Sequence, residues 1–188
     1  MRIIFDIDDT LLPTVTEFIN QCYQKNQVDK IQSLSHLKSI FSDDGWQEFL
    51  SSYNDIRYQL LDRRDVIEWI KFLCKESFTI IEEFVDDGIL VDIRTNLPPI
   101  KDVLIKLLET LDSSFKQLKI PVKDINFLGT RNFEILARQD DGIVVDDSPK
   151  RLMEAYEFIN WETLKVSRPW NSCIKLPFVE FPFHIKST

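Results

Sequence analysis

Short apolar runs alternate with helical patterns along this chain, and the alternation constrains its fold more than any other feature. Five apolar runs of strand length end in polar residues, at residues 2–7, 89–93, 125–128, 143–145 and 163–166. Amphipathic helical patterns lie between most of them, at residues 77–85, 99–111 and 148–159. Strands that alternate with helices predict a parallel sheet covered on both sides. We therefore expect an α/β protein with a three-layer α/β/α core.

One stretch interrupts this alternation. From residue 14 to about residue 75, apolar residues recur only at helical spacing, as in Val15, Phe18 and Ile19. Because this insert follows the first strand directly, we expect it to form a small helical cap on the core. The predicted division assigns residues 1–13 and 76–188 to the core and residues 14–75 to the cap.

The composition narrows the class of ligand. The 188 residues include 23 Lys and Arg against 31 Asp and Glu, which gives a formal net charge of −8. General nucleic-acid binding depends on Lys and Arg that meet phosphates, so this charge argues against it. An acidic protein can still act on a small phosphorylated metabolite where a metal ion or a local cation balances the charge.

The absence of several sequence motifs excludes several kinds of site. Cys22, Cys74 and Cys173 form no CxxC pair, which excludes a zinc knuckle or a redox motif. The four glycines allow neither the GxGxxG fingerprint nor the GxxxxGK[ST] loop. The N-terminus reaches Asp6 before a signal-peptide core could form, and no apolar run approaches the roughly 20 residues of a membrane span. We expect a cytoplasmic protein that does not enter the membrane.

The first strand runs directly into a cluster of acids. Asp6, Asp8 and Asp9 follow apolar residues 3–5 and precede Thr10. Carboxylates this close repel one another, so the arrangement is costly unless a cation lies there. Ligands of parallel α/β sheets bind outside the carboxyl ends of the strands, where an Asp carboxylate can attack a phosphorus centre. The alternative is a solvated acidic turn, which is rare in this order after an apolar strand.

Two later strands end in residues that suit the same chemistry. Thr95 and Asn96 follow the second strand and precede a helix, so the Thr hydroxyl and the neighbouring amides can meet an anion. Asp146 and Asp147 end the fourth strand and repeat the crowding of carboxylates. Mg²⁺ is a hard cation that takes carboxylates, waters and phosphate oxygens, so it fits this set. Taken alone, Thr95 could be a plain cap, and the paired acids could be a helix-capping turn.

Together these motifs resemble those of the haloacid dehalogenase-like superfamily, whose first motif reads DxDx[TV]. The resemblance implies that Asp6 is the nucleophile and Asp8 the general acid/base. Dehalogenase members lack the second Asp, so Asp8 indicates the phosphatase branch. The resemblance also implies that Thr95 donates to the phosphoryl group and that Asp146 binds Mg²⁺ directly, whereas Asp147 acts through water or orients its neighbours. Asp6 and the backbone carbonyl of Asp8 complete the implied metal site.

The resemblance spans most of the chain and extends to its architecture. It implies a Rossmann-like core with a cap of the C1 type, the type inserted after the first motif. Residues 128–131 before the paired acids and residues 168–171 after them are similar to the 5′(3′)-deoxyribonucleotidase group.

The chain departs from the family's pattern in its cations. The family's third motif is a Lys just upstream of the fourth strand, but no Lys occurs between Lys123 and Lys150. Arg138, on a predicted helix at residues 132–139, is the first candidate to bind phosphate in its place, and Arg131 is the second.

Two charged residues also interrupt the second strand. Asp92 and Arg94 lie two residues apart, so they share one face of a strand in which an all-apolar run is normal. Either they pair with each other or Arg94 reaches the site.

The sequence therefore predicts a Mg²⁺-dependent phosphatase that hydrolyses small phosphate monoesters through an aspartyl-phosphate. The expected substrate is a nucleotide, as for a 5′-nucleotidase or deoxyribonucleotidase, and aromatic residues of the cap such as Phe18, Tyr23, Trp46 and Tyr53 could stack on the base. Two alternatives stay open. A polynucleotide-end 3′-phosphatase would need a basic face on the cap, and a catalytically impaired binding or regulatory protein would account for the missing Lys.

Overall fold

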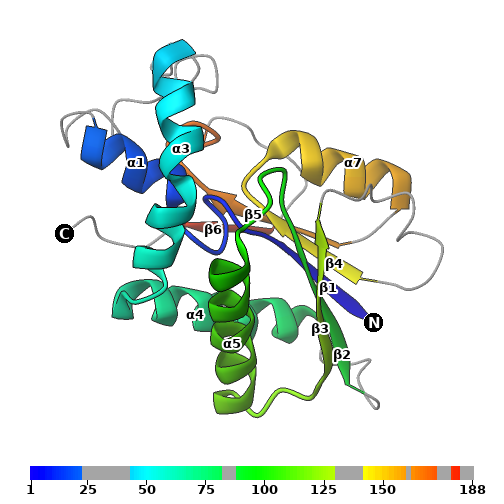
Figure 1. Cartoon of the computed structure of the whole chain (residues 1–188). Coiled ribbons are helices and arrows are strands. Elements are labelled where there is room, and N and C mark those ends of the chain that lie inside the picture. Colours follow the sequence, from blue (N-terminus) through cyan, green and yellow to red (C-terminus); the bar gives the residue numbers. More distant parts are fainter. Residues whose placement is uncertain (23–42, 82–87, 130–141, 160–161, 173–178, 183–188) are drawn as a thin grey trace.

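The computed structural model describes residues 1–22, 43–81, 88–129, 142–159, 162–172 and 179–182. Within these ranges, the strands form one six-stranded, all-parallel sheet in the order β3-β2-β1-β4-β5-β6 (Figure 1). The strands are β1 (Arg2–Asp6), β2 (Ile89–Arg94), β3 (Val122–Gly129), β4 (Gly142–Asp146), β5 (Glu162–Ser167) and β6 (Val179–Pro182). Because the chain builds outward from β1 first on one side and then on the other, the strand order reverses between β1 and β4. Ligands of open parallel sheets bind at such a switch point.

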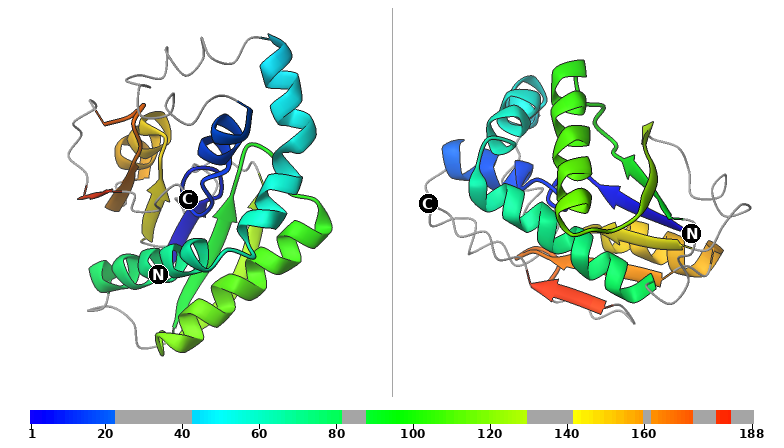
Figure 2. Two further views of the ribbon diagram at one scale, coloured as in Figure 1. Left: turned by 90° about the vertical axis from the view of Figure 1, so that its left-hand side faces the viewer. Right: turned by 90° about the horizontal axis from the view of Figure 1, so that it is seen from below.

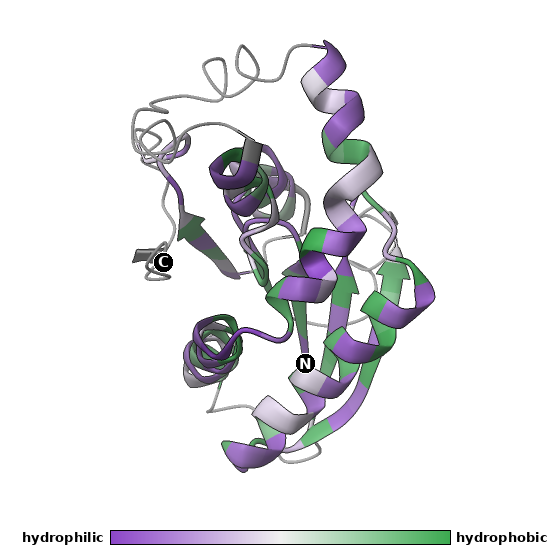
Figure 3. Cartoon of the chain, turned by 60° about the vertical axis from the view of Figure 1, so that its left-hand side comes forward, coloured by the Kyte–Doolittle hydropathy of each residue, from purple (hydrophilic) through white to green (hydrophobic). Residues whose placement is uncertain are grey.

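Helices cover both faces of this sheet. The described helices are α1 (Thr14–Cys22), α3 (Asp43–Leu60), α4 (Arg64–Ile81), α5 (Lys101–Gln117) and α7 (Pro149–Ile159). Figure 2 shows α4 and α5 on one side of the sheet and α7 on the other. Hydrophilic and hydrophobic residues alternate along these helices (Figure 3), as expected of helices that cover a sheet. The predicted Rossmann-like three-layer α/β/α architecture with a parallel sheet is confirmed.

The two faces of β1 pack in different surroundings. Ile3 and Phe5 belong to the main apolar cluster, which α4 and α5 complete. Ile4 points to the opposite face, where it packs with Val144 and Leu152 in a small second cluster under α7. Alternation of side chains along a strand therefore gives the central strand two buried faces.

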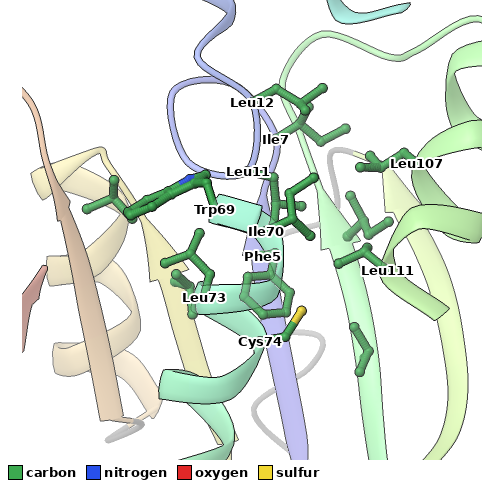
Figure 4. Close-up of a cluster of buried hydrophobic side chains, with 14 of the residues drawn as sticks. Phe5, Ile7, Leu11, Leu12, Trp69, Ile70, Leu73, Cys74, Leu107 and Leu111 are labelled. Carbon is green, nitrogen blue, oxygen red and sulfur yellow. The ribbon is translucent and has the colours of Figure 1, made fainter. Parts of the chain in front are cut away.

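Helix α4 lies over the centre of the sheet. Ile70, Leu73 and Cys74 pack against Phe5 in the cluster of Figure 4. The indole nitrogen of Trp69 donates a hydrogen bond of 2.8 Å to the carbonyl of Thr10, just beyond β1. The predicted division between cap and core at residues 75 and 76 therefore falls inside a helix whose buried side chains belong to the core cluster.

Helices α1 and α3 lie beyond the carboxyl end of β1 (Figure 1). They pack against each other through Phe18 and Phe49, whose rings meet edge to face with centroids 5.2 Å apart. Tyr53 of α3 reaches the loop after β2, because its hydroxyl donates to the carbonyl of Pro98 at 3.0 Å. These two helices, called the cap below, therefore cover the edge of the sheet at which the acidic residues end their strands.

Two details differ from the sequence prediction. The helical pattern at residues 77–85 does not begin a separate helix, because residues up to Ile81 continue α4, and residues 82–87 lie outside the described ranges. Strand β6, which pairs with β5, was not predicted. Each of the five predicted strands is confirmed, with bounds that differ by a few residues at their ends. Among the described helices, none has the length and apolar character needed to cross a membrane.

Replacement of Leu107 by Ala should destabilise the fold by about 2–5 kcal/mol, because its buried side chain packs in the main cluster and its removal leaves a cavity. The matched control is Ile105→Ala on the same helix, where the side chain is 43% exposed and the loss should stay below about 1 kcal/mol. Urea unfolding of both variants measures the difference. Equal losses would show that α5 does not cover the sheet as described.

Candidate active site

Three carboxylates meet at the carboxyl edge of the sheet. Asp6 ends β1 and Asp146 ends β4, and the two strands pair in register, with Phe5 opposite Val145. One oxygen from each of Asp6, Asp146 and Asp147 lies within 4.8 Å of the others. Three hard oxygen donors at this spacing fit a divalent cation such as Mg²⁺. The structure therefore brings together three of the acids that the sequence analysis assigns to the site, whereas the Mg²⁺ itself stays a prediction.

The pKa values of these three carboxyl groups are all raised. Burial raises the pKa of Asp6 well above its ordinary value, and the charges of Asp146, Asp147 and Asp8 raise it further, against a lowering effect of Arg94. Burial also raises the pKa of Asp146, to about 6, and that of Asp147 well above its ordinary value. The cluster therefore favours protonated carboxylates, and a cation bound among them would favour the ionised form instead.

A row of charges crosses the sheet at the same level. Arg94 of β2 lies opposite Asp6 of β1, and Lys165 of β5 lies opposite Asp146 of β4. Side chains in register share a face, and neighbouring strands are about 4.8 Å apart. The row therefore places one cation on each side of the two acids, and both cations are almost completely buried.

The structure also decides between the two predicted roles of the charged pair on β2. Asp92 is bound by Arg2, with an Nη1 to Oδ2 distance of 2.5 Å, and not by Arg94. Arg94 instead faces the acids, where it lowers the pKa of Asp6 and of Asp146. The alternative in which Arg94 reaches the site is therefore the one the structure supports.

The predicted phosphate-binding residues of the second strand lie beside the acids. Thr95 is buried, and its hydroxyl accepts a hydrogen bond of 3.1 Å from the amide of Leu97, which fixes the turn after β2. The same hydroxyl lies 3.4 Å from Oδ2 of Asp8. Arg131 and Arg138, the predicted phosphate-binding cations, lie outside the described residues.

Asp8 is bound by an arginine of the cap. Arg57 of α3 donates through Nε to Oδ1 of Asp8 at 2.9 Å and through Nη2 to Oδ2, so both carboxylate oxygens are occupied. Nη2 also donates to the carbonyl of Leu97 at 2.9 Å. Arg57 is fully buried and lies over the ring of Tyr53, 4.7 Å from its centroid. Sequence reasoning missed this residue, because an Arg in a helical pattern resembles any surface Arg.

Asp9 ties the acidic loop to the first cap helix. Its φ of 56° turns the chain, and its carboxylate accepts hydrogen bonds from the hydroxyl of Thr16 at 2.9 Å and from the amide of Val15 at 3.2 Å. These partners lie in the first turn of α1, where amides have no partner within the helix. Arg168 donates to the carbonyl of Asp9 at 2.6 Å. Burial raises the pKa of Asp9 to about 6, against the lowering effect of Arg168.

The segment after β5 supports Asp147. The indole nitrogen of Trp170 donates to its carboxylate at 3.3 Å, and the side-chain amide of Asn171 donates to its carbonyl at 2.6 Å. Lys165 donates to the carbonyl of Asn171 at 3.3 Å. This part of residues 168–171, noted in the sequence for its position after the paired acids, therefore orients Asp147.

These groups surround one cavity of about 450 Å³. Asp6, Asp8, Thr95, Asn96, Asp146 and Asp147, the predicted site residues within the described ranges, all line it. Val15, Trp46 and Phe49 of the cap line it from the other side. The cavity therefore combines carboxylates that can bind a cation, polar groups that can bind an anion, and an apolar wall.

Comparison with known proteins gives no further guidance. No family model, no curated protein and no solved structure matches the chain. The fold and the site define a parallel α/β protein with an acidic, capped cavity at its switch point, and the argument for function depends on that geometry.

The stability of the metal-free protein should fall as the pH rises from about 4 to about 6. The folded-state pKa of Asp146 is about 6, against 3.8 for the free group, so the folded state binds more protons in this window and loses that advantage above it. Thermal unfolding in EDTA should show a shallower decline for Asp146→Asn than for wild type, by about 1–3 kcal/mol. Mg²⁺ at pH 7.5 should then raise the melting temperature of wild type more than that of the variant. Identical pH profiles would contradict the raised pKa of Asp146.

Proposed function

We propose that this chain is a Mg²⁺-dependent phosphatase of small phosphate monoesters, of the haloacid dehalogenase-like kind, with nucleotides as its substrate class. One observation carries the proposal: the carboxylates of Asp6, Asp146 and Asp147 converge in a cavity that Thr95 and Asn96 also line. Carboxylates for a cation and polar groups for an anion in one cavity are what a phosphate monoester needs. The cavity lies where the chain order of the sheet reverses.

Asp6 would act as the nucleophile. Its carboxylate attacks phosphorus in line, a bond from the carboxylate oxygen to phosphorus forms, and the bond from phosphorus to the ester oxygen breaks with its electron pair going to the leaving alkoxide. The product is an aspartyl-phosphate on Asp6 and an alcohol. Asp6, Asp146 and the backbone carbonyl of Asp8 would hold Mg²⁺, with Asp147 beside them, and the bound ion would supply positive charge between the two anions.

Asp8 would move the protons. It protonates the leaving alkoxide in the first step and takes a proton from the attacking water in the second, which regenerates Asp6 and releases inorganic phosphate. Arg57 binds both oxygens of the Asp8 carboxylate and so fixes its orientation between the cap and the cavity. The hydroxyl of Thr95, 3.4 Å from Asp8, lies where it can reach a phosphoryl oxygen.

The cap supports a nucleotide as the substrate, with a nucleoside as the leaving group. Trp46 of α3 lines the cavity, is 42% exposed and lies on Phe49 with ring centroids 5.5 Å apart. An exposed aromatic face next to a cavity can stack on a flat base. A net charge of −8 counts against a polynucleotide substrate, so a mononucleotide is the better fit.

A cytoplasmic location belongs to the same proposal. Cys74 is a free and buried thiol, which suits a reducing compartment. The substrate would then be a phosphorylated metabolite of the cytoplasm.

Asp6→Asn should abolish phosphate release, because an amide is a poor nucleophile of nearly the same shape. The assay is inorganic phosphate released from a panel of nucleoside monophosphates and simple phosphomonoesters, with Mg²⁺ or with EDTA. Wild type should release phosphate only with Mg²⁺. Activity of Asp6→Asn at the level of wild type would refute the mechanism, and inactivity of wild type on the whole panel would favour a binding or regulatory protein.

Trp46→Ala should raise KM for nucleoside monophosphates by about tenfold, the scale of one lost base-stacking contact. KM for glycerol phosphate, which has no base, should stay within about twofold. Tyr58→Ala is the matched control, because Tyr58 is a similarly exposed aromatic residue of the same helix that does not line the cavity. Equal changes in KM for both substrate types would remove the support for a base-binding wall.

A further inference from the structure

The cavity has an excess of negative charge that a phosphate substrate must meet. The carboxylates of Asp6, Asp8, Asp9, Asp146 and Asp147 line it. Arg57 and Arg168 pair with Asp8 and Asp9, and bound Mg²⁺ would balance two of the three remaining charges, yet a phosphate monoester adds up to two more. A further cation within reach of the phosphoryl group is therefore needed.

Arg151 is the one cationic side chain that lines this cavity within the described part of the chain. The buried arginines nearby bind or face other groups of the protein. Arg57 binds the Asp8 carboxylate, and Arg168 binds the loop at Asp9. Arg94 is 2% exposed and lies in the charged row on the sheet, below the carboxylates it faces. None of these three lines the cavity.

The guanidinium of Arg151 is held from two sides. Arg151 lies in the first turn of α7, five positions after Asp146, and its Nη1 donates to Oε2 of Glu154 at 2.9 Å. Its Nη2 donates to Oδ1 of Asn96 at 3.1 Å. These bonds use two of the five N–H groups of a guanidinium. The side chain is 25% exposed, so it is both positioned and accessible from the cavity.

The hydrogen bond from Arg151 also fixes the orientation of the side-chain amide of Asn96. An amide oxygen that accepts from Arg151 leaves the amide nitrogen of Asn96 as a donor. Asn96 follows Thr95 directly, so the hydroxyl, the amide nitrogen and the guanidinium come from two adjacent elements and line the same cavity. Three donors of this kind match the oxygens of a phosphoryl group, and the planar guanidinium can bind two of those oxygens at once.

We propose that Arg151, positioned by Glu154 and Asn96, binds the phosphoryl group of the substrate and takes the role of the family's Lys, which the sequence lacks between Lys123 and Lys150. This assignment rests on the proposed phosphatase function and adds to it the residue that recognises a phosphate. Arg151 lies after β4, whereas Arg131 and Arg138, the candidates from the sequence, lie before it and outside the described residues.

The test compares Arg151→Gln with Lys150→Gln. Both changes remove one positive charge from the same turn of α7, but Lys150 is exposed and does not line the cavity. Arg151→Gln should lower kcat/KM for the best phosphomonoester by ~10²-fold or more, the scale of one lost preorganised donor. Lys150→Gln should change it by less than about twofold. Arg151→Lys should recover part of the loss, because the point charge returns without the planar fork.

A second readout does not depend on turnover. Titration calorimetry with inorganic phosphate in the presence of Mg²⁺ should show at least tenfold weaker binding for Arg151→Gln and unchanged binding for Lys150→Gln. Near-ultraviolet circular dichroism checks that each variant is folded. Arg151→Lys keeps the charge and the long stem, so it carries the comparison should the Gln variant not fold.

The outcomes separate the two proposals. Equal losses in Arg151→Gln and Lys150→Gln, or none in either, overturn the role of Arg151 while the phosphatase activity of wild type stands. If wild type releases no phosphate from any ester, the proposed function fails, and the titration still decides whether Arg151 binds an anion. Phosphate binding that weakens only in Arg151→Gln supports the anion site, and phosphate binding that is equal in the two Gln variants overturns it.

Discussion

The charged row across the sheet is the constraint on which the rest of the site depends. Two acids at the ends of neighbouring strands, Asp6 and Asp146, repel each other in surroundings where burial already raises the pKa of both. Arg94 and Lys165 lie one strand further out on either side. A buried charge is tolerated only when it is paired or hydrogen-bonded. Arg94 lowers the pKa of both acids and so stabilises their charged forms, whereas Lys165 donates to the carbonyl of Asn171. A metal ion that balances the remaining negative charge would therefore lie between Asp6 and Asp146.

The acids also bind the elements around them. Arg57 and Arg168 are each at most 2% exposed and come from α3 and from the end of β5, respectively. Each binds one residue of the acidic loop, Asp8 in the first case and Asp9 in the second. Because Arg57 belongs to α3 and Asp8 to the acidic loop, the position of the cap and the orientation of Asp8 are linked. Any opening of the cap at α3 would have to break a buried ion pair, and this couples access to the cavity with the geometry of Asp8, the proposed proton-transferring group.

Much of this arrangement could be predicted from the sequence, for a local reason. Asp6, Thr95 and Asp146 each end a strand, and in a parallel sheet the ends of strands meet at one edge. The pattern of apolar residues therefore sufficed to bring them together. The pairs of Arg57 with Asp8 and of Arg151 with Asn96 join residues 49 and 55 positions apart. No periodicity in the sequence identifies such partners, because an Arg in a helical pattern can equally well be exposed to solvent.

The predicted boundary of the cap falls inside α4 for a related reason. An amphipathic helix shows the same spacing whether its apolar face covers a sheet or other helices, so α4 could not be assigned to the sheet from its pattern. Its place follows from tertiary contacts such as that of Trp69 with the carbonyl of Thr10. Strand β6 has four residues and ends in Pro182, too little for a strand signal.

The unequal faces of the sheet explain why the chemistry lies where it does. The face toward α4 and α5 carries the large apolar cluster, whereas the face toward α7 carries a small one. On the α7 face, register places Asp92, Arg94, Thr163 and Lys165 among the few apolar residues. Burial of apolar surface stabilises a fold in proportion to its area, so the first face supplies most of that stability. The second face can therefore hold buried charges that destabilise it, and at its carboxyl edge lie Asp6 and Asp146, which line the cavity.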